Sequence, residues 1–557
     1  MFSWGNALAL PSVGVDVDKE RKPPPRPTPL DFPSYELPDV AEAPSEASFR
    51  DLESLLLAVR KPQDISAAHL RALNLRVHSD VPVADIVQQD RLTTLPPLAW
   101  EDGESTQPTA ETSTGHGLCT SNGYPYPTRG KFDVVRNELL FDNDDAFREV
   151  SRLPPRPGRQ KVKLTQSRKF WSALDRMAQY WDASLDNYIE RSLTADSASA
   201  DERMQTDNEQ SDNVDESNKM DIDSGSATRG SLRKEANEDA KSTETMYTGR
   251  RIGTGSEMPE DIREDTVRGF IEMAAWPFGC QVNIPTNPPR LAVRNLLFPV
   301  RQTLVAGRAP SDRQIAKRGI LEGPLLLAQC RPDTVFREPG QAAGHGTQEL
   351  CDLFREVGGL LLTAQERARE DAMEVRPGEG KWWTTTPRWG GAPNEGVTGD
   401  GRNSDDTSPP GKGNIHKRSK LDHAVSSSRR PGPGSSRKMS ASEKWKIIAP
   451  PQSLWDKRMK YMQIGKPKDS PFDDIYMISS INHHVSIVHL RVHRSYIDAL
   501  TTGKVEQPVG PTDSEQPWHV IHLRRTRWFD LLEATDRVEA FEGLWRIFHY
   551  LMRKDSD

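Results

Sequence analysis

The chain has 557 residues and a formal net charge of -7, and 35% of its residues are hydrophobic against 28% charged. With 43 prolines and 38 glycines, this composition is too polar for a chain that folds throughout, so we expect ordered blocks separated by unstructured insertions. The four cysteines are far apart, which argues against a zinc knuckle or a redox dithiol and fits a reducing compartment. No apolar run approaches the roughly 20 residues that span a bilayer, so we expect neither secretion nor membrane insertion.

The N-terminal part is predicted to be helical after a disordered start. Residues 1–44 contain the run KPPPRPTP and too few periodic apolar residues to offset the entropy of ordering, so we predict disorder there. Residues 45–98 are predicted as a helical segment, because SEASFRDLESLLLAVR spaces its apolar residues like one face of a helix. Residues 99–130 are rich in Gly, Ser and Thr and are predicted as a loop.

Residues 131–195 are predicted as a second helical segment, which contains a long amphipathic helix over 165–192. Apolar side chains recur in this helix at intervals of three and four residues, the period of one helix face. The apolar stripe consists of Phe170, Trp171, Leu174, Met177, Ala178, Trp181, Leu185, Tyr188 and Ile189. We interpret this stripe as a face packed on the protein's own core, not as a ligand site.

Two charged insertions of opposite sign flank the next block. Residues 196–256 are predicted to be a disordered acidic insertion, since the stretch 196–223 contains ten acidic residues against two basic ones. Residues 373–446 are predicted to be a disordered basic linker rich in Gly, Pro and Ser. Between them, residues 257–372 alternate expected helices and strands, so we predict a mixed α/β block.

The last block, residues 447–557, is predicted to be α+β. Residues 474–481 and 485–494, DIYMISSI and VSIVHLRVHR, are rich in β-branched residues and are expected to form a hairpin. WHVIHLRRTR is expected to be a third strand, and TDRVEAFEGLWRIFHYLMR a terminal helix. We expect this block to share a core with residues 257–372, because each alone has too few layers to cover a sheet. The predicted fold class is α+β, with a helical N-terminal part, a mixed α/β core, and C-terminal antiparallel strands plus a helix.

The segment NHHVSIVHLRVHR raises the question of a metal site, because it holds four histidines in thirteen positions. On a strand, His489 and His493 would lie about 13 Å apart, at about 3.3 Å per residue, which is too far for one zinc ion. Leu490 also stands where the H-E-x-x-H motif has its glutamate. A cross-strand pairing of His489 with His522 is the remaining route to a site. We therefore expect no metal and no other cofactor.

A basic surface is the stronger candidate for a binding function. The segments IVHLRVHR at 487–494 and VIHLRRTR at 520–527 share one pattern of His, Leu and Arg. As two strands they would form a basic face that contacts phosphates or an acidic partner segment. The alternative is a solvated sheet face whose long side chains cover the apolar layer beneath. The candidate residues for an anionic partner are Arg491, Arg494, Arg524, Arg525 and Arg527. The histidines expected on the same face are His489, His493 and His522.

The predicted basic linker contains KRSK followed by RR, which resembles a bipartite nuclear-import signal. The residues of this signal are Lys417, Arg418, Lys420, Arg429 and Arg430. In a flexible linker they would be accessible to an importin-type carrier. The alternative is a generic basic linker. We therefore expect a nuclear protein, with the cytoplasm as the alternative location.

The catalytic motifs that the sequence offers are incomplete. GRRIGTGS at 249–256 lacks the lysine of a P-loop, and FDNDDAFRE at 141–149 lacks the glycine and the third ligand of a calcium loop. We therefore expect a non-enzymatic intracellular protein, an interaction or scaffold subunit of a larger assembly. The alternative is a nucleic-acid-binding protein that uses the basic C-terminal strands. An enzyme would require polar residues from distant blocks to meet in one pocket.

Overall fold

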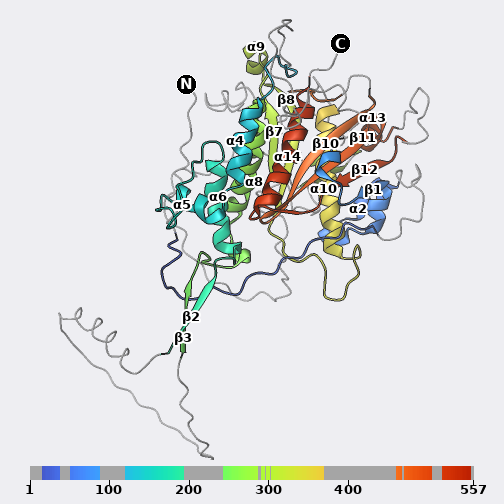
Figure 1. The fold of residues 1–557 in the computed structure, drawn as a ribbon. Helices are drawn as coiled ribbons and strands as arrows, with labels where there is room; N and C mark the ends of the chain where they lie inside the picture. The colour runs from blue at the N-terminus through green and yellow to red at the C-terminus, as the bar shows by residue number, and fades with distance from the viewer. Residues whose placement is uncertain are drawn as a thin grey trace, which may run out of the picture. The chain divides into compact units, whose positions relative to one another are not determined.

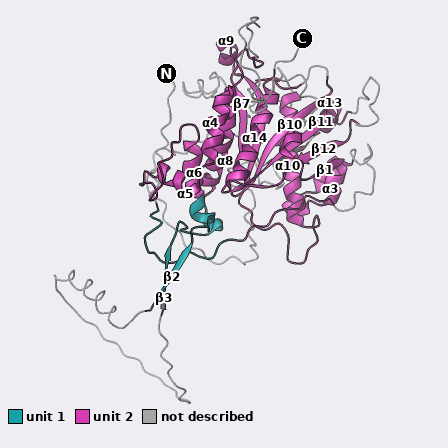
Figure 2. Cartoon of the chain, in the orientation of Figure 1, with its two compact units in different colours: residues 1–28, 178–258 teal, residues 29–177, 259–557 magenta. Residues whose placement is uncertain are grey.

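The computed structural model describes eleven stretches of the chain. They are residues 15–37, 51–59, 61–87, 119–192, 243–285, 290–294, 296–300, 303–368, 460–466, 470–504 and 517–553. The predicted basic linker, with its import signal, lies outside these residues. The chain divides into two compact units, one of residues 1–28 and 178–258 and one of residues 29–177 and 259–557 (Figure 2).

Helices and strands are interspersed along the described chain (Figure 1). The α-helices are α2 (Leu52–Ala58), α3 (Ala67–Ala72), α4 (Arg129–Leu139), α5 (Asn143–Val150), α6 (Arg168–Trp181), α8 (Glu260–Ala275), α9 (Arg313–Lys317), α10 (Thr347–Ala368), α13 (Arg494–Thr502) and α14 (Ala534–Leu551). The strands are β1 (Leu75–His78), β2 (Asn187–Ser192), β3 (Thr243–Thr248), β4 (Cys280–Asn283), β5 (Arg290–Val293), β6 (Leu296–Pro299), β7 (Leu304–Arg308), β8 (Ile320–Arg331), β9 (Lys460–Met462), β10 (Phe472–Ile481), β11 (His484–His493), β12 (Ile521–Arg525) and β13 (Phe529–Asp530). The short 3-10 helices are η1 (Pro62–Asp64), η2 (Val83–Asp85), η4 (Gly255–Glu257) and η5 (Trp276–Phe278).

A mixed sheet is the centre of the larger unit. Its strands follow the order β1-β12-β11-β10-β8-β7-β4, and β9 and β13 pair with β8 and β11. The predicted C-terminal hairpin is the antiparallel pair β10–β11, whereas β8 and β10 are parallel and are joined by a crossover that contains α10. Because β8 and β10 are neighbours, residues 257–372 and 447–557 contribute to one sheet. The predicted α+β class is confirmed.

Helices cover both faces of this sheet. On one face, Met477 and Leu490 belong to a buried apolar cluster that includes residues of α10, α13, α2 and α3. On the other face, Ile487 lies against α14 at Gly543, where a Cβ atom would collide with the Ile487 side chain. The glycine therefore lets this helix approach the sheet closely. No helix among the described residues is long and apolar enough to cross a membrane.

The long helix predicted over 165–192 is wrong in its second half. Helix α6 ends at Trp181, and the Asp182 carboxylate then accepts the backbone N–H of Ser184 at 2.9 Å, an Asx turn that diverts the chain. Residues 187–192 form β2, which pairs with β3 in the smaller unit. The first half of the apolar stripe is buried as predicted, but Tyr188 and Ile189 are 46% and 41% exposed.

The predicted disorder of residues 196–256 does not extend to their C-terminal end. Strand β3 and the turn after it lie among the described residues, whereas residues 193–242 lie outside them. The buried Arg251 guanidinium donates through Nε to Asp186 at 2.8 Å, and the Tyr247 hydroxyl donates to the same carboxylate at 2.7 Å. Asp186 precedes the predicted insertion in the sequence, so the composition of the insertion could not reveal this partner.

The proline-rich start also contains ordered residues, contrary to the prediction for 1–44. We call residues 29–37 the N-terminal strap. Its backbone donates from Asp31 to the Thr334 carbonyl and from Ser34 to a Glu349 carboxylate, both at 2.9 Å. Tyr35 is only 5% exposed. Proline limits the entropy that an extended segment loses on docking, so such a segment can order without periodic apolar residues.

The predicted segments 45–98 and 99–130 also need correction. The first contains the short helices α2 and α3, but it also supplies β1 to the sheet. In the second, helix α4 begins at Arg129, before the predicted end of the loop. Residues 88–118, which include most of that predicted loop and the end of the segment before it, lie outside the described residues. Strand β1 was missed because its four residues are too short for a clear alternation.

Candidate functional site

A cluster of basic side chains lies on one face of β1, β12 and β11. In the sheet register, His522 of β12 pairs with Arg76 on one side and with Arg491 on the other, while Arg524 pairs with His78. Residues that pair directly across strands project from the same face of a sheet. We call this group the basic patch; it consists of Arg76, His78, Arg491, His522 and Arg524.

The two histidines of the basic patch are held next to each other. Nε2 of His78 lies 3.2 Å from Nδ1 of His522, and the rings stack with an interplanar angle of 17°. Burial lowers the pKa of His522, and His78, Arg491 and Arg76 lower it further. Burial also lowers the pKa of His78, with added effects from Arg524 and Arg76. Both imidazoles are therefore largely neutral at pH 7, and arginines carry the positive charge.

The arginines of the basic patch differ in their partners. Arg491 lies over the Phe472 ring, 4.7 Å from its centroid, in a cation–π contact. Within the described part of the chain, Arg76 and Arg524 make no ion pair, although both are partly exposed. Guanidinium groups in this state can bind carboxylates or phosphates from outside through paired N–H donors.

Two other predicted arginines lie on the surface but are already paired with acids. Arg494, at the start of α13, lies 3.4 Å from Asp498. Arg527 donates to Asp536 at 2.8 Å and to Glu539 at 2.6 Å. These arginines lie near the strand ends, as expected, but their charge is locally neutralised.

Arg525, the fifth candidate, points to the opposite face of the sheet. It is 2% exposed, and its NH1 group donates to Glu356 of α10 at 3.1 Å. The expectation that it helps bind an outside partner is therefore wrong, because a buried, paired guanidinium is not accessible. Adjacent strand residues face opposite ways, so Arg524 and Arg525 cannot share one surface.

The predicted histidines of β11 are not part of the basic patch either. His489 is fully buried, with Nε2 3.0 Å from Asp474 and its ring stacked on Tyr476. His493 caps helix α13 by accepting the backbone N–H of Ser495 at 3.0 Å. The register pairs His489 with Arg524 and not with His522, so the cross-strand metal pair does not form.

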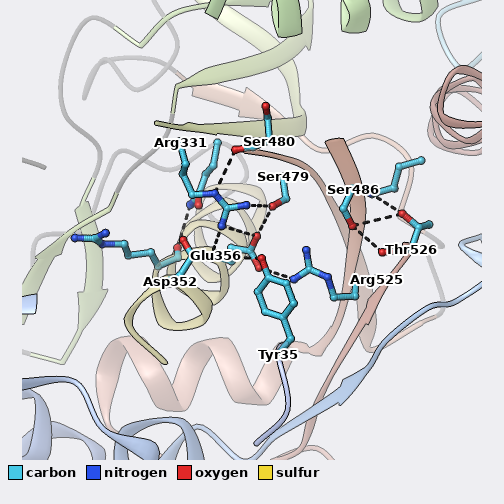
Figure 3. A network of polar contacts seen from close by, with 12 residues as sticks. Tyr35, Arg331, Asp352, Glu356, Ser479, Ser480, Ser486, Arg525 and Thr526 are labelled. Carbon is cyan, nitrogen blue, oxygen red and sulfur yellow. Dashed lines mark hydrogen bonds and ion pairs between the residues drawn. The ribbon is translucent and has the colours of Figure 1, made fainter. Parts of the chain in front are cut away.

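A buried ionic network occupies the α10 face of the sheet, at strands β8, β10 and β12 (Figure 3). Glu356 of α10 accepts from Arg525 at 3.1 Å and pairs with Arg331 of β8 at 3.1 Å. Arg331 also donates to Asp352 and to Ser479, and the Ser479 hydroxyl donates to Glu356. Two cations and two anions thus compensate each other where water is excluded.

The N-terminal strap closes this network. The Tyr35 ring lies under Arg525, whose guanidinium carbon is 3.3 Å from the ring centroid, and its hydroxyl lies 3.4 Å from Asp352 (Figure 3). Burial alone would raise the pKa of Glu356, but the charges of Arg525 and Arg331 hold it below its usual range. Burial raises the pKa of Asp352. With every charge paired, the network is suited to holding elements together and not to binding a ligand.

A cleft of about 370 Å³ lies next to the strap, along the segment between β8 and α10. All of its lining residues come from positions 332–338, 341, 347 and 348. It therefore does not bring polar residues from distant blocks together, which is what the enzyme hypothesis requires.

Comparisons with protein-family models, with curated proteins and with solved structures find no match to this chain. The chemistry of the basic patch therefore carries the functional conclusion. Sequence reasoning found Arg491, His522 and Arg524 through the repeated strand pattern. It missed Arg76 and His78, because only the parallel pairing of β1 with a strand more than 400 residues later places them there.

Proposed function

We propose that this chain is a non-enzymatic interaction or scaffold protein, a subunit of a larger assembly, that binds an acidic segment of a partner protein at the basic patch. This proposal rests on one observation: Arg76 and Arg524 make no ion pair with any of the described residues. Arg494 and Arg527, also near the surface, each have a carboxylate partner. An acidic segment of a partner protein would supply carboxylates to the arginines of the basic patch, as Arg494 and Arg527 already have them within the chain.

Nucleic-acid binding is the second candidate, because phosphates would also pair with these arginines. Single-stranded nucleic acids usually gain affinity by stacking bases on aromatic side chains. Among the described residues of the basic patch, the rings of His78 and His522 stack on each other, and the Arg491 guanidinium covers the neighbouring Phe472 ring. These rings are therefore already engaged, which favours carboxylates over stacked bases.

We further propose a nuclear location, with the cytoplasm as the alternative. The support is the import-like signal at 417–430, which lies outside the described residues. An importin-type carrier is its expected partner.

Replacing two patch arginines should weaken binding of an acidic peptide by at least about tenfold, since each charge-assisted pair contributes about 1.5–3 kcal/mol. The change is the double variant Arg76→Ser with Arg524→Ser in the full chain. Fluorescence anisotropy with a labelled glutamate-rich peptide and with a single-stranded oligonucleotide measures the effect at about 50 and about 200 mM salt.

The matched control is Arg494→Ser with Arg527→Ser, which removes the same charge from paired arginines. The control should leave peptide affinity within about twofold, because Arg494 and Arg527 are already paired with carboxylates of the chain. Equal losses in both double variants would mean diffuse electrostatic attraction and would overturn the proposal. Tighter binding of the oligonucleotide than of the peptide, lost in the patch variant, would favour the second candidate instead.

Acidification should strengthen peptide binding at the basic patch. The pKa values of His78 and His522 lie below their usual value near 6.5, so these rings gain charge mainly as the pH falls below that value. Titrations between about pH 7.5 and about pH 5.5 should show the affinity rising, since glutamates stay ionised throughout this range. His78→Gln with His522→Gln should give a flat profile. An unchanged rise in that variant would contradict the assignment.

A further inference from the structure

The turn between β10 and β11 brings together three side chains that sequence reasoning did not connect. Asn482 adopts a left-handed conformation with φ of 53°, which turns the chain sharply. His483 follows in the turn, and His484 begins β11, where it pairs in register with Asp530 of β13. Adjacent strand residues would face opposite ways, but the turn lets both imidazoles approach one carboxylate.

We propose that His483, His484 and Asp530 form a binding site for a divalent metal ion of the zinc type. The Nε2 atoms of His483 and His484 lie 3.8 Å and 3.7 Å from Oδ2 of Asp530. The three ligand atoms all lie within 4.8 Å of one another. Donor atoms on a tetrahedral zinc ion with bonds of about 2.0–2.1 Å are about 3.4 Å apart. Side-chain shifts of less than about 1 Å would therefore bring them to ligand distance.

The carboxylates of Asp530 and Asp536 lie close to the His484 imidazole and favour positive charge there. Burial of the cluster opposes that charge, since it lowers the pKa of both imidazoles and raises the pKa of Asp530. The geometry of the three ligand atoms therefore carries the site.

Surrounding contacts hold Asp530 and His484 in position. Oδ1 of Asp530 accepts the backbone N–H of Leu532 at 2.8 Å, and the Asp530 backbone N–H donates to Asp536 at 2.9 Å. The Phe32 ring of the N-terminal strap lies edge-on to His484, with centroids 4.8 Å apart. Such outer contacts orient metal ligands and reduce the reorganisation that binding requires.

The ligand set selects the class of metal. Two imidazole nitrogens and one carboxylate oxygen suit Zn²⁺, Co²⁺ or Ni²⁺, whereas Mg²⁺ and Ca²⁺ prefer oxygen ligands. Three protein ligands leave the fourth tetrahedral position for water or for a partner's side chain. A bound ion would fasten the β10–β11 turn to β13, which is a structural role and does not depend on the basic patch.

Zinc titration of the metal-free full chain by calorimetry tests the site, and the absorption spectrum of bound Co²⁺ reports its geometry. We expect one ion per chain. Asp530→Asn and His484→Gln should each weaken zinc binding by at least about 100-fold. Loss of a group that only supports a ligand weakens metal binding by up to about 100-fold, and these variants remove a ligand itself. Added zinc should raise the melting temperature of the unmodified chain, since it binds the folded state, and should not raise that of either variant.

His345→Gln is the matched control, because His345 is exposed and stands outside the cluster. It should bind zinc like the unmodified chain. His78→Gln with His522→Gln should also bind normally, and loss of binding in that variant would place the ion in the basic patch and overturn the proposal. No zinc uptake, or equal uptake by Asp530→Asn in a chain with unchanged circular dichroism, would overturn it as well.

Discussion

Replacing Glu356 by alanine should destabilise the larger unit by about 3–5 kcal/mol, the range measured when one partner of a buried ion pair is removed. Glu356 is fully buried and pairs with two cations, Arg331 and Arg525, each at 3.1 Å. Its removal leaves Arg525 without its carboxylate in an environment that excludes water. Arg331 keeps Asp352, so the loss falls mainly on the β12 side of the network.

Urea unfolding followed by circular dichroism measures this effect. The matched control is Glu539→Ala, which removes a carboxylate of the same type that is 43% exposed and pairs with Arg527. The control should cost less than about 1 kcal/mol, because water screens exposed pairs. If both variants lose the same stability, the buried network does not hold α10 to the sheet in the way that its geometry indicates.

The part of the fold that could be predicted is the part with local signals. Val485, Ile487 and Val492 are β-branched residues within one short run, and the hairpin they indicate is present. The helix over 165–192 failed because Leu185, Tyr188 and Ile189 continue the helical period although the chain has already turned at Asp182. The spacing of apolar residues cannot reveal a side chain, such as that of Asp182, that accepts a backbone N–H in place of a helical carbonyl.

The candidate site was also predictable only where its residues belong to a local sequence pattern. Arg491 and Arg524 follow from a pattern repeated within 40 residues, whereas Arg76 joins them only through the long-range pairing of β1. Strand alternation could have separated Arg524 from Arg525 before the structure was known. It could not have identified Glu356 as the buried partner, because that carboxylate lies 169 residues earlier, on α10.

The N-terminal strap is ordered although its composition predicts disorder. The variant Tyr35→Ala tests how much the strap contributes to stability. The expected cost is about 3–5 kcal/mol, the usual range for deleting a large buried aromatic ring. The Tyr35 ring packs against the Arg525 guanidinium, and its centroid lies 6.4 Å from that of Trp528, so its loss also opens the ionic network to water.

The matched variant is Tyr35→Phe, which keeps the ring and removes only the hydroxyl. That hydroxyl lies 3.4 Å from Asp352, near the limit of a hydrogen bond, so the variant should cost less than about 1.5 kcal/mol. Urea unfolding of both variants beside the unmodified chain compares the two contributions. If phenylalanine costs as much as alanine, the hydroxyl holds the strap in place, and the stacking of the ring under Arg525 contributes little. If neither variant loses stability, residues 29–37 only rest on a network that is complete without them, and the order of this proline-rich segment needs a different physical cause.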